Sequence, residues 1–306
     1  MVIKSASFAV VCVLWLGLSA ASAQDLDAVE FSSVKAADNL YMLHGAGGNI
    51  GLFLGPDGIF LIDDQFAPLH KKLIAKIEEL SGDSLFDRAR TFLINTHFHP
   101  DHTGGNELLG ESGAVIVAHE NVRNRLAGER SVPFFNSHNP PMSPDGLPVI
   151  TFSRDITFHL NGDSVSVAHM GRAHTDGDAI VHFTRANVIH AGDIVFTQSY
   201  PFVDIDNGGS VPGVIQAVER LLVLADDQTA IIPGHGDLTD RAGLQRYHDM
   251  LVAILDRVSG MLQEGKSLEQ IQAARLTQDY DDQFKGSVSG DAFVGFIYKE
   301  LAEKQD

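Results

Sequence analysis

Hydrophobic positions between residues 39 and 63 come in short runs and predict strands. Apolar runs at 40–43, 50–54 and 59–62 are separated by Gly45-Ala46-Gly47-Gly48-Asn49 and by Gly55-Pro56-Asp57-Gly58. Runs of this length, bounded by Gly, Pro, Asn and Asp, are typical of β-strands joined by turns. We therefore expect an antiparallel meander at the start of the fold.

A helical spacing replaces this pattern between Pro68 and Ser81. Leu69, Leu73 and Ile77 recur every four residues and share one face of a helix. The same criterion predicts further helices over 105–109, 211–225, 238–262, 268–274 and 291–304. Further short strands are predicted at 92–94, 114–118, 150–152, 156–160, 164–169, 179–184, 187–191 and 229–232. Strands interleaved with helices favour a layered α/β domain.

One long segment, 120–148, breaks the pattern. It contains several Pro and Asn residues, with Phe134 and Phe135 at its centre. A loop of this length in a compact domain is usually functional or a lid. The two phenylalanines are expected either to wall a pocket or to form a local hydrophobic plug.

The first residues have the pattern of a targeting segment. Lys4 precedes the apolar run 8–18, and Ala21-Ser22-Ala23 fits a small-x-small cleavage site. We expect a signal peptide over 1–23 and a single mature domain over 24–306. The run is short for a membrane span. The mature protein is therefore predicted to be periplasmic or secreted, without stable membrane association.

Composition narrows the function further. Of 306 residues, 44% are hydrophobic and 20% are charged, which is ordinary for a globular protein. The formal charge of −18 argues against binding to nucleic acid. The one cysteine, Cys12, lies in the predicted signal peptide, which excludes a disulfide, a cysteine nucleophile or a cysteine-based metal site in the mature chain. A small-molecule substrate is the expected partner.

The densest chemistry lies in Thr96-His97-Phe98-His99-Pro100-Asp101-His102-Thr103-Gly104-Gly105-Asn106. On extended backbone His97 and His99 face one side, whereas the adjacent Asp101 and His102 can point elsewhere from a turn. Imidazole and carboxylate are good ligands for divalent zinc. Two directions of approach therefore predict two metal centres.

Further candidate ligands follow short apolar strands beside glycine. His174 lies in Gly171-Arg172-Ala173-His174-Thr175-Asp176-Gly177-Asp178, Asp193 in Ala191-Gly192-Asp193, and His235 in Pro233-Gly234-His235-Gly236. If these strand ends converge with His97 on one rim of a sheet, they complete one site. Asp178 is expected to cap a turn beside His174.

Together these motifs resemble the metallo-β-lactamase superfamily, with Asp63 as the first of five motifs. The resemblance covers residues of about 39 to 236 and implies an α/β fold, a four-layer αββα sandwich. The implied ligands of the first metal are His97, His99 and His174. The implied ligands of the second metal are Asp101, His102 and His235. Asp193 falls at the position of a bridging carboxylate, and Asp63 would orient ligands.

The resemblance also implies a mechanism. Two zinc ions roughly 3.5–4 Å apart can hold a hydroxide that attacks a polarised carbonyl. Asp101 is the expected catalytic carboxylate, which orients the nucleophile or relays a proton. The same ligands also accept iron or manganese, so the native metal stays open.

Substrate and reaction leave several alternatives. A β-lactam is the leading substrate hypothesis, because the chain resembles this superfamily and is predicted to be periplasmic. Asp193 stands where typical B1 β-lactamases carry cysteine and where glyoxalase II-like hydrolases carry aspartate, which favours a lactonase or thioesterase as the alternative. An iron-dependent sulfur dioxygenase is a third enzyme hypothesis. A metal-binding accessory protein of a periplasmic redox system is the alternative of another class. The oligomeric state stays open.

Overall fold

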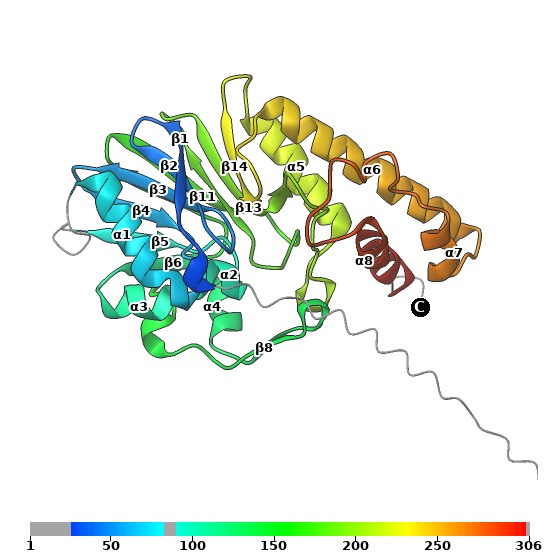
Figure 1. Cartoon of the computed structure of the whole chain (residues 1–306), viewed down its shortest axis with the longest axis horizontal. Helices are drawn as coiled ribbons and strands as arrows, with labels where there is room; N and C mark the ends of the chain where they lie inside the picture. The colour runs from blue at the N-terminus through cyan, green and yellow to red at the C-terminus, as the bar shows by residue number, and fades with distance from the viewer. Residues whose placement is uncertain (1–25, 83–89, 304–306) are drawn as a thin grey trace, which may run out of the picture.

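Two β-sheets stacked face to face form the centre of the protein (Figure 1). The computed structural model describes residues 26–82 and 90–303, so the predicted signal peptide lies outside the described residues. One sheet has seven strands in the order β1-β2-β3-β4-β5-β6-β9, and the other has five in the order β10-β11-β12-β13-β14.

The first sheet begins with the predicted antiparallel meander and continues with parallel strands. Its strands are β1 (Ser32–Ala37), β2 (Leu40–His44), β3 (Ile50–Gly55), β4 (Gly58–Ile62), β5 (Thr91–Ile94), β6 (Val115–His119) and β9 (Ile150–Phe152). The meander is confirmed, because β1 to β4 pair in antiparallel order. From β4 onward the strands end at one common edge.

The second sheet is antiparallel except for its last pair, β13 and β14. Its strands are β10 (Asp155–Leu160), β11 (Asp163–His169), β12 (Ala179–Phe183), β13 (Val188–Phe196) and β14 (Ala230–His235). A separate hairpin pairs β7 (Arg130–Val132) with β8 (Ser137–Asn139).

Helices cover the outer face of each sheet. Those beside the first sheet are α1 (His70–Ser81), α3 (Asn106–Glu111) and α4 (Glu120–Leu126), and those beside the second are α5 (Val211–Leu224) and α6 (Arg241–Gln263). Helices α7 (Leu268–Ala273) and α8 (Gly290–Glu303) pack on α6 and on each other, farther from the sheets (Figure 1). The single turn α2 (Pro100–Thr103) lies at the strand ends. Short 3-10 helices are η1 (Leu26–Ala28), η2 (Ala67–Leu69), η4 (Pro133–Phe135), η5 (Pro144–Gly146) and η6 (Ile205–Asn207). None of the described helices is long and apolar enough to span a membrane.

Three buried clusters join these layers. One lies between the sheets and includes Phe60, Phe183 and Val165; a second packs the first sheet on α1; a third packs the second sheet on α5 and α6. Phe53 meets Phe183 edge-on at 5.2 Å across the inter-sheet layer, a geometry worth about 0.5–1.5 kcal/mol beyond area burial. This helix–sheet–sheet–helix order confirms the predicted αββα sandwich.

Several elements differ from the sequence prediction. Segment 120–148 is structured, because it holds α4 and the β7–β8 hairpin. The strand predicted over 187–191 continues as β13 to Phe196, and the one predicted over 229–232 continues as β14 to His235. Gly192 has a φ of +54°, and the pairing register shifts around it. This irregularity lets β13 carry Asp193 into the site.

Candidate metal centre

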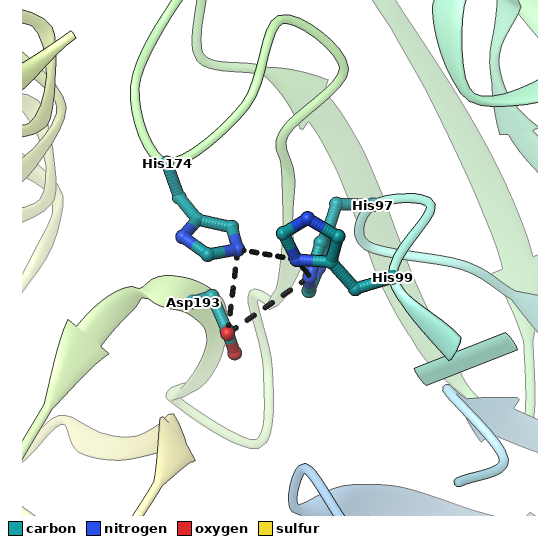
Figure 2. A group of neighbouring side chains, drawn as sticks. All are labelled: His97, His99, His174 and Asp193. Carbon is teal, nitrogen blue, oxygen red and sulfur yellow. Dashed lines mark hydrogen bonds and ion pairs between the residues drawn. The ribbon is translucent and has the colours of Figure 1, made fainter. Parts of the chain in front are cut away.

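All seven predicted ligands meet at the edge where the strands of the two sheets end. Their ligand atoms fall into two groups, each with mutual distances within 4.8 Å. The first group comprises His97, His99, His174 and Asp193, and Figure 2 shows these side chains pointing toward one another, His97 and His99 from one loop and His174 and Asp193 from two other segments. The second group comprises Asp101, His102 and His235. The predicted convergence is thus present, and the binding of metal by these residues stays a prediction.

Pro100 divides the motif between the two groups. His99 has extended backbone with a ψ of 148° and is the N-cap of α2, while Pro100 occupies the first turn. Proline suits that position because its missing N–H needs no partner there. His97 and His99 therefore extend from the loop after β5, whereas Asp101 and His102 lie on the helical turn.

Glycines allow this turn to lie close to the loop after β4. A Cβ on Gly104 would stand 2.7 Å from the carbonyl oxygens of Gln65 and Pro100. A Cβ on Gly105 would stand 3.0 Å from the Asp64 carboxyl carbon. Side chains at these positions would push α2, and with it Asp101 and His102, away from the site.

The first group is compact and buried. His99 Nδ1 lies 3.1 Å from His97 Nε2 and 2.9 Å from His174 Nε2. Asp193 Oδ2 lies 3.4 Å from His174 Nε2 and 3.9 Å from His97 Nε2. Each of these four residues is at most 6% exposed.

The outer nitrogens of these imidazoles are held by the protein. His174 Nδ1 donates to the Phe202 carbonyl at 2.7 Å, and His99 Nε2 donates to Asp204 Oδ2 at 2.9 Å. Thr96 Oγ1 donates its proton to Asp63, so it accepts from His97 Nδ1 at 3.1 Å. Each imidazole therefore directs an unprotonated nitrogen at the others.

Converging lone pairs of this kind repel one another unless a cation lies between them. Metal-binding histidines typically donate their outer N–H to a carboxylate or carbonyl, which fixes the tautomer. Nitrogen and carboxylate oxygen are also the donors that zinc prefers. The residues of the first group therefore fit a divalent metal ion.

The second group lies nearer the surface and shares Asp193. Asp193 Oδ1 is buried without a hydrogen bond, 3.1 Å from His102 Nε2. His235 Nε2 lies 3.3 Å from Asp101 Oδ2 and 3.4 Å from Asp193 Oδ2. The side chains of Asp101 and His235 are 24% and 32% exposed. The Asp193 carboxylate thus faces both groups, as a bridging ligand would.

Asp63 anchors the second group, as the sequence predicts. Its Oδ2 accepts from His102 Nδ1 at 2.8 Å, and its Oδ1 accepts from the Thr96 amide at 2.8 Å. Asp63 has a φ of +61°, a left-handed conformation that is uncommon for a residue other than glycine. This backbone geometry aims the carboxylate at both His102 and Thr96.

Electrostatics separate the two groups. Burial lowers the pKa of His97 well below its usual value and that of His174 to about 4, so both imidazoles stay neutral. Burial also opposes charge on His102 and His235, but Asp193 and Asp101 outweigh it and raise both pKa values, that of His235 to about 9. In the metal-free chain, the positive charge of protonated His102 and His235 therefore offsets the negative charge of Asp101 and Asp193.

Both site carboxylates are ionised. Burial alone would raise the pKa of Asp101 and Asp193, but the neighbouring histidines, His102 foremost, hold both pKa values well below the ordinary range. Asp178 behaves differently, because burial raises its pKa to about 8. It accepts from the amide and the hydroxyl of Thr175 at 2.8 and 2.5 Å. This confirms the expected turn cap beside His174.

Asp204 is the site residue that the sequence analysis missed. Besides His99, it accepts from Asn207 Nδ2 at 2.8 Å, and Asn207 Oδ1 in turn accepts from Arg125 NH1 at 2.8 Å. Arg125 also pairs through two nitrogens with Asp176 at 2.7 Å. The chain of contacts ties His99 to helix α4. No motif marks Asp204, since its partner His99 lies 105 positions earlier.

A cavity of about 360 Å³ opens beside both groups. His99, Asp101, Asp193 and His235 contribute to its wall. The remaining wall is mostly apolar and includes Phe66, Val132, Phe135, Phe196, Phe202 and Val288. A small molecule in this cavity would lie directly against the candidate metal ligands.

Comparisons with known proteins agree with this architecture. The family model described as "Metallo-beta-lactamase superfamily" matches residues 91–235. A hydroxyacylglutathione hydrolase of Polaromonas sp. is 28% identical over 149 residues, which are 47% of this chain and 48% of that relative. A metallo-beta-lactamase type 2 of Bacillus cereus is 24% identical over 195 residues, 63% of this chain and 69% of that protein. The alignment thus spans about half the length of the first relative.

Solved structures show the same fold. The metallo-beta-lactamase from Pontibacter korlensis superposes with a TM-score of 0.58 at 18% identity, over 72% of this chain and 99% of that one. At this identity the likeness concerns the fold alone. The family match covers the loop that carries His97 to His102 and continues to His235. With the relatives and the shared fold, it supports the resemblance to the metallo-beta-lactamase superfamily, which is centred on residues 91–235.

Proposed function

We propose that this chain is a secreted metal-dependent hydrolase that holds two divalent ions, zinc in the first instance, and cleaves an acyl bond in a small molecule. One observation carries the proposal: two groups of ligand atoms flank the Asp193 carboxylate at the wall of an open cavity. The names of the two relatives, a hydroxyacylglutathione hydrolase and a metallo-beta-lactamase, support a hydrolase.

The chain's own residues would divide the work. His97, His99 and His174 with Asp193 would hold one ion, and Asp101, His102 and His235 the other. Bound divalent ions supply Lewis acidity to a carbonyl and lower the pKa of water.

Asp101 is the residue placed to handle a proton. Its carboxylate lies on the cavity wall and is partly exposed. Its low pKa keeps the carboxylate ionised, so that Oδ2 can accept a hydrogen bond from an attacking water and orient it. Asp63 and Asp204 would orient His102 and His99.

Two substrate classes follow from the sequence, a β-lactam and a lactone, ester or thioester. The Bacillus cereus relative supports the first by its name. The Polaromonas relative and the aspartate at position 193 support the second. We favour the second class, because no lysine or arginine is among the described residues that line the cavity to pair with the carboxylate of a β-lactam.

The test is hydrolysis by the mature chain, residues 24–306, loaded with zinc and assayed with and without a chelator. A chromogenic cephalosporin, a thioester, a lactone and a p-nitrophenyl ester represent the classes. We expect turnover that the chelator abolishes, and loss of most turnover in Asp101→Asn with the fold retained. Asp206→Asn is the matched control, since Asp206 pairs with Lys299 and belongs to neither group.

Other results of this experiment would favour other functions or other residue roles. Two bound ions with no turnover on any substrate would contradict the proposal and favour the metal-binding accessory protein. A single iron ion per chain would favour the dioxygenase. Wild-type turnover and two ions in Asp101→Asn would contradict the assignment of Asp101.

A further inference from the structure

The cavity beside the metal groups has two unlike walls. One carries His99, Asp101, Asp193 and His235. The second wall consists of hydrocarbon side chains from distant segments, among them Val132, Phe135, Phe202 and Val288. A substrate whose reacting carbonyl meets the first wall must place its remaining atoms against the second.

Polar groups on the second wall are few among the described residues, namely Ser137, Ser199 and the exposed Ser287, and the first two are engaged within the protein. Ser199 Oγ donates to the Tyr200 carbonyl at 2.9 Å and accepts from the Val288 amide at 3.1 Å. Ser137 Oγ accepts from Asn139 Nδ2 at 2.9 Å. These hydroxyls already contribute to the wall's own structure.

A negative charge on the substrate would have no lysine or arginine of the described chain to pair with at the second wall. Within the described part of the chain, no lysine or arginine lines this cavity. Arg130 lies in a separate hollow, where its NH2 donates to the Pro140 carbonyl at 2.7 Å. A carboxylate placed against the hydrocarbon wall would lose water without gaining a counter-ion, which is costly.

We propose that the substrate carries a neutral, apolar acyl group, as in an ester, lactone or thioester of a hydrocarbon chain, and that this group lies between Val132, Phe135, Phe202 and Val288. The inference rests on the proposed hydrolase function and specifies its substrate class. Substrates whose acyl group carries a negative charge should bind more weakly at the same site.

Phe135 is the specificity-determining residue on which this inference turns. It lies in η4 between the hairpin strands, is 51% exposed, and its ring centroid is 4.8 Å from that of Phe202. Phe202 in turn lies 5.8 Å from the ring of His99. Phe135 therefore extends the apolar wall from the candidate metal site to the cavity's rim.

Phe134 provides a matched control beside it. It is 43% exposed, packs on Phe296 at 5.1 Å and on the ring of Phe202 at 5.3 Å, and lines a different hollow. The two adjacent residues are of one type and of similar exposure, yet only Phe135 lines the cavity.

The first experiment measures kcat/KM for p-nitrophenyl acetate, butyrate, hexanoate and octanoate with the zinc-loaded chain. Burial of each added methylene predicts a rise of about three- to fourfold until the cavity is full. The mono-p-nitrophenyl ester of octanedioic acid matches the octanoate in length but ends in a carboxylate. We expect it to be hydrolysed at least about tenfold less efficiently. Equal rates for this pair, or no rise with chain length, would overturn the proposal.

The second experiment compares variants at the two phenylalanines. Phe135→Ala should flatten the rise with chain length, and Phe135→Lys should narrow or reverse the preference for octanoate over its carboxylate analogue. Phe134→Ala should retain more of the slope and of the preference than Phe135→Ala does, because Phe134 reaches the cavity only through Phe135 and Phe202. An unchanged preference in both Phe135 variants would contradict the role of Phe135.

A binding measurement separates this inference from the proposed function. Octan-2-one is neutral and has no bond to hydrolyse, and 7-oxooctanoate is its counterpart with a carboxylate at the far end of the chain. In the metal-free chain we expect octan-2-one to raise the thermal midpoint more than 7-oxooctanoate does, and Phe135→Ala to remove the difference. Absence of hydrolysis with this selectivity intact would overturn the proposed function alone. Hydrolysis of esters without selectivity for neutral chains would overturn the inference alone.

Discussion

The two ligand groups differ in depth and in charge, although they share Asp193. The first group is almost fully buried, burial lowers the pKa of His97 and His174 so that both stay neutral, and the outer nitrogens of its histidines are bonded to protein. The second group has Asp101 and His235 at the cavity wall, and its histidines are drawn toward the protonated form by the carboxylates. A deep, neutral, preorganised group should hold a cation more tightly than a shallow one that must first release protons.

Loss of the shared ligand should have the largest effect. Asp193→Asn removes the carboxylate that faces both groups, so we expect both ions to be weakened and kcat/KM to fall by roughly 10³-fold, or about 4 kcal/mol. Metal analysis and ester hydrolysis on the same sample check this. Retention of two ions and of wild-type turnover would show that Asp193 is a structural acceptor.

A matched pair of histidine variants tests the difference in depth. His235→Ala removes a partly exposed ligand of the second group, and we expect about one ion per chain to remain after gel filtration. His174→Ala removes a fully buried ligand of the first group. The His174→Ala chain should therefore retain fewer metal ions than the His235→Ala chain does. Circular dichroism verifies that both variants fold. The reverse order of retained metal would contradict the comparison.

Proton release should also distinguish the groups. In the metal-free chain the pKa of His235 is about 9, so this imidazole is protonated at pH 7 and an ion must displace that proton. Affinity at the second group should therefore fall as pH falls, by about tenfold per unit for each displaced proton. The pKa of His174 is about 4, so it is already deprotonated between pH 8 and 6.

Calorimetric zinc titrations in buffers of different ionisation enthalpy measure these protons directly. We expect the tighter event to release fewer protons than the weaker one. Equal proton release in both events would show that the two groups do not differ in protonation.

The smallest effect is expected at Asp204, which touches a ligand and not the ion. Asp204→Asn leaves His99 without its carboxylate partner, and metal affinity at the first group should fall by about 10- to 100-fold. Asp206→Asn is the matched control on the same 3-10 helix, because Asp206 pairs with Lys299 away from the ligands. Equal metal affinities in the two variants would show that Asp204 does not orient His99 for metal binding.

The sequence predicts which candidate ligands converge, because each of them lies in a motif at the end of a strand. It also predicts the meander and the layering, since those follow from local apolar runs. Strand β1 was missed because Ser32–Ala37 is a polar, largely exposed edge strand. The three-residue strands of the hairpin show no alternation long enough to recognise.

The cavity could not be predicted for a different reason. Its apolar wall joins Val132, Phe135, Phe202 and Val288, which only tertiary structure brings together. Asp204 likewise depends on contacts with His99 and Asn207 across the fold. Short sequence motifs contain the candidate ligands. The residues that orient these ligands and line the cavity come from distant parts of the sequence.

Anomalous diffraction at the zinc edge tests the central claim most directly, with crystals prepared at one and at two equivalents of zinc per chain. We predict one peak among His97, His99, His174 and Asp193 at one equivalent, and a second peak beside Asp101, His102 and His235 at two. A first peak at the second group would contradict the unequal affinities. No peak at either group would contradict the metal centre itself.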